Sequence, residues 1–291
     1  MKTKMMGDVS FSLREDHDFR WLEEIGHVFC VFDEQDSGNI SFGVENEDGK
    51  FFVKYAGAKP MDFAGEPEDA VERLKTAIPV YEQLDHPFLI KLKNHFALRE
   101  GYAAVFDWAE GECLHSHWSH GGPAKYTDPT SPYYRFRNLD VTKRLKTLET
   151  IFSFHAFVEE QGFVAVDFYD GSILYDFKND VTTICDIDFY RKCPTFNDIG
   201  EEFWGADRSK SPEEYELGAV IDERTNVYTM GAIAFGLLGG ETDHSLSSWE
   251  AGEDLYEVAS KAVNKDKEAR YKNVRAFMKA WKEVKERLTF T

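Results

Sequence analysis

Hydrophobic and polar positions alternate along the chain in two different periods, which together predict a mixture of strands and helices. Short apolar runs bounded by Gly, Asn and Asp predict strands at 21–26, 39–45, 51–55 and 102–106. The Asp48-Gly49 pair predicts a hairpin turn between the second and the third of these strands. Apolar residues spaced by three and four predict helices at 67–84, 141–161 and 273–288.

Proline and glycine mark the ends of these helices. Pro67 suits the first turn of the first helix, and Pro79 is expected to kink it. Gly162 is expected to end the second helix. On that helix His155 falls on the apolar face, where a packed core residue is a better interpretation than a ligand.

The stretch 162–190 contains a second hairpin with acidic residues on both sides. Apolar runs at 173–177 and 181–185 are joined by the polar tripeptide Lys178-Asn179-Asp180. Four carboxylates flank them: Asp167 and Asp170 before, Asp186 and Asp188 after. Closing the hairpin brings these groups towards one patch, and oxygen-only ligands suit Mg²⁺. The plain alternative is that they are solvated turn residues.

Composition and charge narrow the class of protein. The 291 residues are 42% hydrophobic and 15% aromatic, which predicts a globular protein of one large or two small domains. The net charge of −19 argues against nucleic acid and against an anionic membrane surface as the main partner. Four cysteines without C-x-x-C spacing are expected to be free thiols. With no long apolar run and no apolar leader at the start, we expect a cytoplasmic protein.

Several motifs, in order, resemble those of the protein kinases. Residues 162–190 are similar to the catalytic loop H-R-D-L-x-x-x-N followed by two strands and D-F-G. The run H-P-F-L-I-K-L at 86–92 resembles the segment that follows the N-lobe helix of that family. S-P-E at 211–213 and Arg270 resemble a structural ion pair, and 222–231 resembles the start of the central helix, with Asn226 in place of Asp but still able to accept a hydrogen bond from the catalytic loop.

This resemblance implies an α+β, two-lobed protein-kinase-like fold, with an N-lobe of antiparallel sheet plus one helix and a mainly helical C-lobe. The implied boundaries are an N-terminal extension at 1–20, the N-lobe at 21–106, a hinge at 107–114 and the C-lobe at 115–291. Within the C-lobe, 115–140 is polar and aperiodic, and we expect a long inserted loop that could form a partner or substrate surface.

The resemblance also implies a site for ATP and Mg²⁺. Asp167 matches the catalytic Asp, Asp186 the metal-binding Asp and Ser172 the metal-binding Asn, with Asp188 as an extra ligand. Lys54 matches the strand Lys that holds the α- and β-phosphates. The remaining nucleotide contacts implied by the resemblance are Gly38, Phe106, Asp107, Ala109, Glu112 and Leu174.

The chain also departs from the kinase pattern. Ala165-Val166 replaces His-Arg, and Ile187-Asp188 replaces Phe-Gly. Ala77 stands where the family has the Glu that pairs with the strand Lys, and the more distant Glu72 is a weak substitute. The loop 32–39 keeps only Gly38 and carries three carboxylates, a composition that should weaken phosphate binding. Because Val166 cannot grip a phosphate, we expect no activation by phosphorylation of the protein's own loop.

Three functions therefore stay open. The first is an atypical ATP-dependent serine/threonine kinase that phosphorylates a protein, and the second is a pseudokinase that acts as a binding or signalling scaffold. The third is a small-molecule phosphotransferase similar to aminoglycoside or choline kinases, for which Ile187-Asp188-Phe189 would be the metal motif. A metal site at His115, His117 and His120 is a weaker hypothesis than a plain surface loop.

Overall fold

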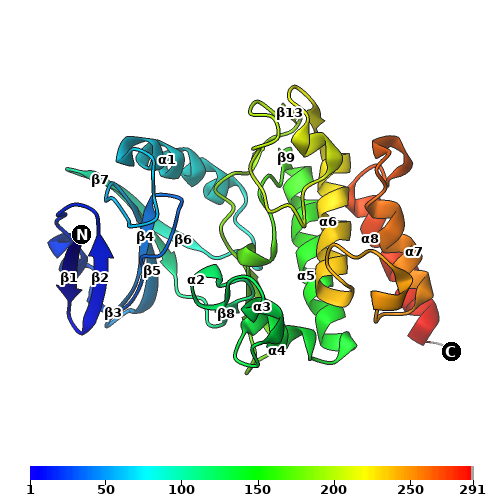
Figure 1. Cartoon of the computed structure of the whole chain (residues 1–291), viewed down its shortest axis with the longest axis horizontal. Helices are drawn as coiled ribbons and strands as arrows, with labels where there is room; N and C mark the ends of the chain where they lie inside the picture. The colour runs from blue at the N-terminus through cyan, green and yellow to red at the C-terminus, as the bar shows by residue number, and fades with distance from the viewer. Residues whose placement is uncertain (290–291) are drawn as a thin grey trace. The chain divides into compact units, whose positions relative to one another are not determined.

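The computed structural model describes residues 1–289, without the side chains of residues 117, 118, 288 and 289. The described chain is an α+β protein with several antiparallel sheets (Figure 1). It folds as two compact units, Met1–Glu110 and a second unit that begins at Gly111. Among the described residues, no helix combines the length and the apolar character needed to cross a bilayer.

The first unit is built on a five-stranded antiparallel sheet in the order β3-β4-β5-β7-β6. Its strands are β3 (His27–Phe32), β4 (Asn39–Asn46), β5 (Gly49–Ala56), β6 (Leu92–Leu98) and β7 (Gly101–Asp107). The strands predicted at 39–45, 51–55 and 102–106 are confirmed. The predicted helix at 67–84 is confirmed as α1 (Pro67–Gln83), which packs against β5 and β7 and continues through the exposed Pro79.

The strand predicted at 21–26 is wrong. Arg20–Glu24 forms a single 3-10 turn, η1, that buries Leu22, and the strand that follows begins only at His27. One helical turn is enough to bury Leu22 in the core, while Glu23 and Glu24 remain in solvent.

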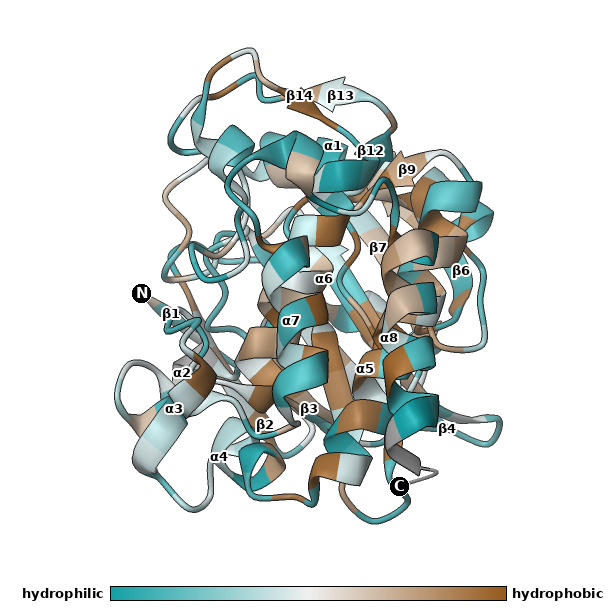
Figure 2. Cartoon of the chain, turned by 90° about the vertical axis from the view of Figure 1, so that its right-hand side faces the viewer, coloured by the Kyte–Doolittle hydropathy of each residue, from teal (hydrophilic) through white to brown (hydrophobic). Residues whose placement is uncertain are grey.

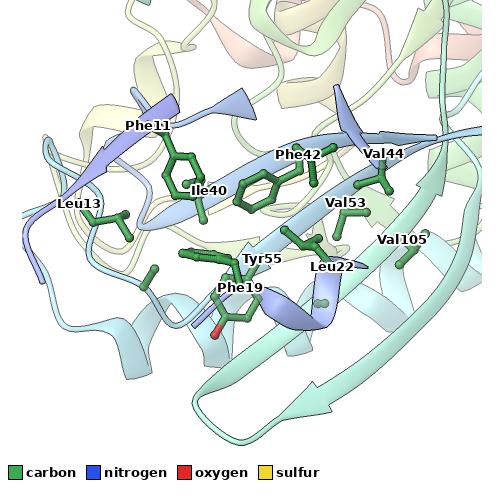
Figure 3. Packing of buried hydrophobic residues seen from close by; sticks show 13 residues of the cluster. Phe11, Leu13, Phe19, Leu22, Ile40, Phe42, Val44, Val53, Tyr55 and Val105 are labelled. Carbon is green, nitrogen blue, oxygen red and sulfur yellow. The ribbon is translucent and has the colours of Figure 1, made fainter. Parts of the chain in front are cut away.

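Residues 1–20, which the resemblance set apart as an extension, are part of the core of the first unit. They form the hairpin β1 (Lys2–Met6) and β2 (Val9–Leu13) before η1. Phe11, Leu13 and Phe19 pack with Phe42 and Tyr55 of the sheet (Figure 3). The rings of Phe11 and Phe19 meet edge to face at 5.3 Å, an arrangement that adds to the gain from burial.

The second unit is built around long helices (Figures 1 and 2). They are α5 (Val141–Glu160), α6 (Glu223–Leu238), α7 (Glu253–Ala262) and α8 (Val274–Thr289). α6 is apolar almost all round and buried, as expected for a helix enclosed by others. The predicted helices at 141–161 and 273–288 are confirmed. Gly162 follows the C-cap of α5 with φ +73°, so the predicted stop is also confirmed.

The stretch 115–140 is not the structureless loop that its composition predicted. It contains three short helices, α2 (His117–His120), α3 (Ala124–Thr127) and α4 (Pro132–Arg137). Lys125, Ser131 and Phe136 are buried, so this stretch belongs to the packed body of its unit. The Ser131 hydroxyl donates to the carbonyl of Lys125, which ties α3 to α4.

Short strands and 3-10 turns complete the second unit. The predicted hairpin at 173–185 is confirmed as β10 (Ile173–Asp176) and β11 (Val181–Ile184), and β8 (Glu112–Cys113) pairs with the other edge of β10. Two further pairs are β9 (Phe163–Val164) with β12 (Arg191–Lys192) and β13 (Thr195–Phe196) with β14 (Val220–Ile221). The 3-10 turns are η2 (Asp170–Ser172), η3 (Pro212–Tyr215), η4 (Leu246–Ser248) and η5 (Lys267–Ala269).

Candidate functional site

Two aspartates on either side of the β10–β11 hairpin have strained backbones. Asp167, just before η2, has φ +64°, and Asp186, just after β11, has φ +53°. Residues other than glycine adopt this left-handed conformation at a cost of about 1 kcal/mol or more, and such residues concentrate at functional sites. These are the two positions that the resemblance assigned to the catalytic and the metal-binding Asp.

Ser172 links the loop that carries Asp167 to the strand that leads to Asp186. Its N–H donates to the carbonyl of Tyr169 at 3.0 Å, and its own carbonyl accepts from Cys185 N–H at 2.9 Å. The Ser172 hydroxyl is fully buried and has no hydrogen-bond partner among the described residues. A buried polar group without a partner is costly, and a ligand that coordinates it would remove that cost.

The charges of Asp167 and Asp186 both affect the pKa of the buried Tyr169 phenol. Burial raises the pKa of the Tyr169 phenol, and the negative charges of Asp186 and Asp167 raise it further. The same two carboxylates raise the pKa of the buried Tyr190, again after burial itself. Both carboxylates therefore act on the same two phenols within this unit.

Asp170, the fourth carboxylate of the predicted patch, has two cationic partners of its own. Its buried side chain accepts a hydrogen bond from Nε of Arg208 at 3.0 Å and lies 2.7 Å from Nζ of Lys125. Burial alone would raise the pKa of Asp170, but these two cations hold it below its usual value. In the part of the chain that the structure describes, no three His, Cys, Asp or Glu side chains are grouped to hold a metal.

The partners of Asp170 form a buried network that sequence reasoning missed. Nζ of Lys125, only 3% exposed, lies 2.5 Å from the carboxylate of Glu241, which also accepts from the Tyr126 hydroxyl at 2.6 Å. The positive charge of Lys125 also lies 4.2 Å from the centre of the Tyr133 ring. Two cations and two carboxylates therefore balance, and they join α3, the loop before β10 and the segment of Arg208.

Asn226 fastens the start of the same loop to the buried helix α6. Its side-chain oxygen accepts from the N–H of Ala165 at 2.8 Å, the hydrogen bond expected from the sequence. Its amide group donates to the carboxylate of Glu159 at 3.2 Å, and that carboxylate also accepts from Val274 N–H at 2.9 Å. The loop that carries Asp167 is thus held from both ends by buried groups.

The expected ion pair between Arg270 and Glu213 is present, with hydrogen bonds of 2.7 and 2.9 Å. Both residues belong to the second unit: Glu213 lies in η3, and Arg270 directly follows η5. Its bidentate geometry is the strongest form of an Arg–carboxylate contact.

In the first unit, Lys54 lies on the sheet face that α1 covers. It is 8% exposed on β5, opposite Ala104 of β7 and Ser41 of β4. Lys54 shares this face with Phe52 and Phe106, because β5 and β7 pair Lys54 with Ala104 and Phe52 with Phe106. A lysine this buried is costly in an apolar core and is a candidate for a specific role.

The loop between β3 and β4 carries the three carboxylates expected to weaken phosphate binding. Asp33 accepts a hydrogen bond from the N–H of Ser12 at 3.0 Å, so β2 engages one of them. Gly38 has φ +82°, and a Cβ there would lie 2.8 Å from the ring of Phe63 and 2.9 Å from Cβ of Ala70. Close packing therefore explains Gly38 without a phosphate.

The other predicted nucleotide contacts have partners inside their own units. Phe106 is buried and meets the Tyr81 ring at 4.9 Å. Asp107 lies 3.5 Å from Nζ of Lys93 and is followed by the half-buried Ala109. In the second unit, both oxygens of Glu112 lie 2.8 Å from Nη1 of Arg135.

Leu174, also proposed as a nucleotide contact, is a half-buried residue of β10 opposite Cys113 of β8. Asp188 lies beyond β11, two residues after Asp186, and is half-buried. Ser172 ends η2 directly before β10, Leu174 lies on β10, and Asp186 follows β11 at the same open end of the hairpin as Ser172.

His155 is a packed core residue, as predicted. His155 is buried, bonded to the Ile151 carbonyl and to the Tyr190 hydroxyl at 2.7 Å, and burial lowers its pKa to about 3. His120 bonds the Thr130 hydroxyl at 3.1 Å, the His115 ring lies 6.2 Å from that of Tyr169, and the side chain of His117 lies outside the described residues. The four cysteines are free thiols, as predicted.

Comparison with known proteins adds no relative: no protein-family model matches the chain, and no curated protein matches it significantly.

Proposed function

We propose that this chain is an atypical ATP-dependent phosphotransferase of the protein-kinase type, which phosphorylates a hydroxyl group of a protein. The proposal includes the two-lobed kinase-like arrangement, in which residues of both units serve one nucleotide. The observation that carries it is the strained pair Asp167 and Asp186 around a buried Ser172 hydroxyl that has no partner among the described residues.

The residues of the second unit suit a nucleotide-bound Mg²⁺. Such an ion needs only one or two protein carboxylates, because phosphates and water complete its shell. Asp186 and Asp188 supply the carboxylates, and the Ser172 hydroxyl supplies an oxygen that is otherwise without a partner among the described residues. When bound, Mg²⁺ neutralises the charge that builds on the phosphate oxygens.

The proposal gives the other residues positional roles. Asp167 orients the acceptor hydroxyl and takes its proton as the new oxygen–phosphorus bond forms and ADP leaves. Lys54 holds the α- and β-phosphates with a point charge on a rigid strand. Asn226 keeps the Asp167 loop in place through Ala165, at 2.8 Å. Phosphoryl transfer needs little beyond such positioning and charge stabilisation.

One observation favours the second candidate, a nucleotide-binding or signalling scaffold without turnover. Ala77, at the position where the family has a Glu, is fully buried in α1, so no carboxylate can be supplied from that point. Glu72, the possible substitute, is exposed. A chain that binds Mg-ATP but transfers no phosphate would fit this candidate.

Thermal denaturation with and without Mg-ATP, together with transfer of labelled phosphate to a protein acceptor, tests the proposal. At a hundred times the dissociation constant, binding should add about 2.7 kcal/mol of stability. Asp186→Asn and Lys54→Met should reduce this shift, whereas Asp167→Asn should keep the shift and lose the transfer. If millimolar Mg-ATP caused no thermal shift, both the phosphotransferase and the nucleotide-binding scaffold would be contradicted.

A further inference from the structure

The second unit exposes an unusual number of apolar side chains in one short segment. Of the eleven large apolar residues exposed in the described chain, six lie between residues 196 and 220. They are Phe196, Ile199, Trp204, Tyr215, Leu217 and Val220. Single exposed apolar residues are ordinary, but a concentration of this kind marks an interaction surface. We refer to these six residues as the 196–220 surface.

Contacts within the unit bring several of these residues together. Phe196 of β13 stands directly opposite Val220 of β14, and a Cβ on Gly200 would lie 3.8 Å from Cβ of Leu217. Figure 2 draws β13 and β14 at the margin of their unit, with apolar colour on β14. A preformed surface loses little conformational entropy on binding.

Buried Asn197 organises the turn beneath this surface. Its side-chain oxygen accepts from the N–H groups of Ile199 and Gly200, at 3.0 and 2.7 Å. Its amide donates to the carbonyls of Gly200 and Glu214, both at 3.0 Å. Four hydrogen bonds from one buried side chain fix the backbone that carries Ile199 and the pocket that follows.

An acidic pocket of about 470 Å³ adjoins the apolar residues. Trp204 and Tyr215 line it together with the carboxylates of Glu201, Glu202 and Asp207. The lysine in its wall, Lys210, donates to the carbonyl of Glu201 at 3.1 Å and lies 4.2 Å from the Tyr215 ring centre. Glu201 and Glu202 are exposed and have no ion-pair partner among the described residues. The pocket therefore offers negative charge beside aromatic rings.

We propose that the 196–220 surface and this pocket dock a polypeptide segment of a partner protein that carries basic side chains next to apolar ones. The carboxylates attract cations, and the exposed ring of Trp204 offers a further contact to a guanidinium or ammonium group. A second copy of this chain is a poor occupant, because two such acidic faces repel each other in a chain of net charge −19.

The docking surface lies beside the candidate catalytic residue. A Cβ on Gly205, in the pocket wall, would lie 3.9 Å from Cα of Asp167. Under the proposed function the docked segment is the phosphoryl acceptor, and this one consequence rests on that function. The binding itself does not require phosphoryl transfer.

Fluorescence anisotropy with the full chain tests the inference, with no nucleotide present. The probe is a short labelled peptide of alternating Arg and Leu residues, compared with Gln-Leu and Arg-Ser peptides of the same length. We expect the Arg-Leu peptide to bind about tenfold more tightly than either comparison peptide, since charge and apolar area both contribute. Equal binding of the Arg-Leu and Arg-Ser peptides would overturn the apolar part of the surface.

Amino-acid substitutions test whether the Arg-Leu peptide binds at the 196–220 surface and its pocket. Leu217→Ser, and the pair Glu201→Gln with Glu202→Gln, should each weaken Arg-Leu binding by about tenfold. The matched control is Glu257→Gln with Glu286→Gln, exposed carboxylates on α7 and α8, which should leave binding unchanged. Equal weakening in the control would reduce the effect to overall charge and overturn the proposal.

Two further measurements separate the alternatives. Unchanged urea midpoints show that the Leu217→Ser and Glu201→Gln/Glu202→Gln variants remain folded. Sedimentation of the free chain that reveals a dimer lost in Leu217→Ser would assign the surface to self-association instead. Peptide binding without any Mg-ATP shift would uphold this inference while the proposed function failed, and a Mg-ATP shift with no selective peptide binding would show the reverse.

Discussion

The guanidinium of Arg270 grips the carboxylate of Glu213 with two hydrogen bonds, at 2.7 and 2.9 Å, although 57 positions separate them in the chain. The Arg270 side chain is fully buried. Its Nε also donates to the carbonyl of Asn264 at 2.7 Å, and Glu213 accepts from the Thr225 hydroxyl at 2.9 Å. Burial alone would raise the pKa of Glu213, but Arg270 holds it below its usual value.

Replacing Arg270 with Met should destabilise the second unit by about 3–5 kcal/mol, because the buried Glu213 carboxylate loses its partner. Urea denaturation followed by tryptophan fluorescence measures the loss. Adding Glu213→Gln to Arg270→Met should recover part of it, since the unpaired charge is then gone. A double variant that is no more stable than the single one would contradict this account.

Lys125→Met should cost about 3 kcal/mol for the same reason, because the buried Asp170 and the partly buried Glu241 share that cation. In a double-mutant cycle with Glu241→Gln, we expect a coupling free energy of about 1–3 kcal/mol. Lys143→Met is a suitable control, because Lys143 pairs with Asp180 at a surface site where both side chains are partly exposed. Losses of equal size at Lys125 and Lys143 would show that the buried network is no stronger than a surface pair.

Stability should fall as pH rises through neutrality, because burial raises the pKa of Glu159 from 4.5 to about 8. The folded chain holds this proton more tightly than the unfolded chain, so its contribution is complete below about pH 4.5 and is lost by about pH 8. Each unit of pKa shift corresponds to about 1.4 kcal/mol, so the fall amounts to a few kcal/mol.

Glu159→Gln, which stays neutral at every pH, should lose less stability than the parent chain between pH 5 and pH 8. Urea denaturation at the two pH values measures the difference. Burial also raises the pKa of Glu214, to about 7, so some pH dependence remains until Glu214→Gln is added. The exposed Glu257→Gln is the control, and pH profiles that coincide for Glu159→Gln and Glu257→Gln would refute the assignment.

Gly38→Ala should destabilise the first unit by about 2 kcal/mol, because the new Cβ meets Phe63 and Ala70 in addition to the strain at φ +82°. Gly49→Ala separates these causes, since Gly49 has φ +131° with nothing within 4 Å of a new Cβ. Gly49→Ala should therefore lower the free energy of unfolding only through backbone strain, by about 1 kcal/mol. Thermal denaturation that ranks Gly49→Ala as the more damaging substitution would contradict the packing role of Gly38.

Ser172→Ala separates stability from binding. Its hydroxyl is buried without a hydrogen bond among the described residues, so its removal should leave stability unchanged or raise it by up to about 1 kcal/mol. If Ser172 holds the nucleotide's metal, the same variant should weaken Mg-ATP binding, measured as a smaller thermal shift. Thr147→Ala is the control, because its hydroxyl bonds that of Thr182 at 2.9 Å and its loss should lower stability. A variant Ser172→Ala with a full Mg-ATP shift would remove Ser172 from the site.

Short sequence motifs predicted much of the candidate site. The hairpin β10–β11, its flanking aspartates, the Arg270–Glu213 pair and the Asn226 contact with Ala165 all rest on short motifs in a fixed order. The hairpin forms once its turn closes, so neighbouring residues carry that information. The Arg270–Glu213 and Asn226–Ala165 contacts join residues 57 and 61 positions apart and were expected only from the resemblance. The ion pairs of Asp170 were not predicted, because its partners Lys125 and Arg208 are 45 and 38 positions away in the chain. Nothing in the sequence around either partner indicates that it contacts a buried carboxylate.

Periodicity alone was enough to predict α1, α5, α8 and the strands β4, β5 and β7, since each has a repeating apolar face or a short apolar run between turn residues. The same reading was wrong at Arg20–Glu24 and at 115–140, where burial depends on what packs against the segment. Leu22 enters a core formed with Phe42 and Tyr55, and Lys125 is buried only because Asp170 and Glu241 come to meet its charge. Hydrophobic period is a property of neighbours in the chain, whereas burial of a charge or a lone apolar residue is a property of partners brought together by folding.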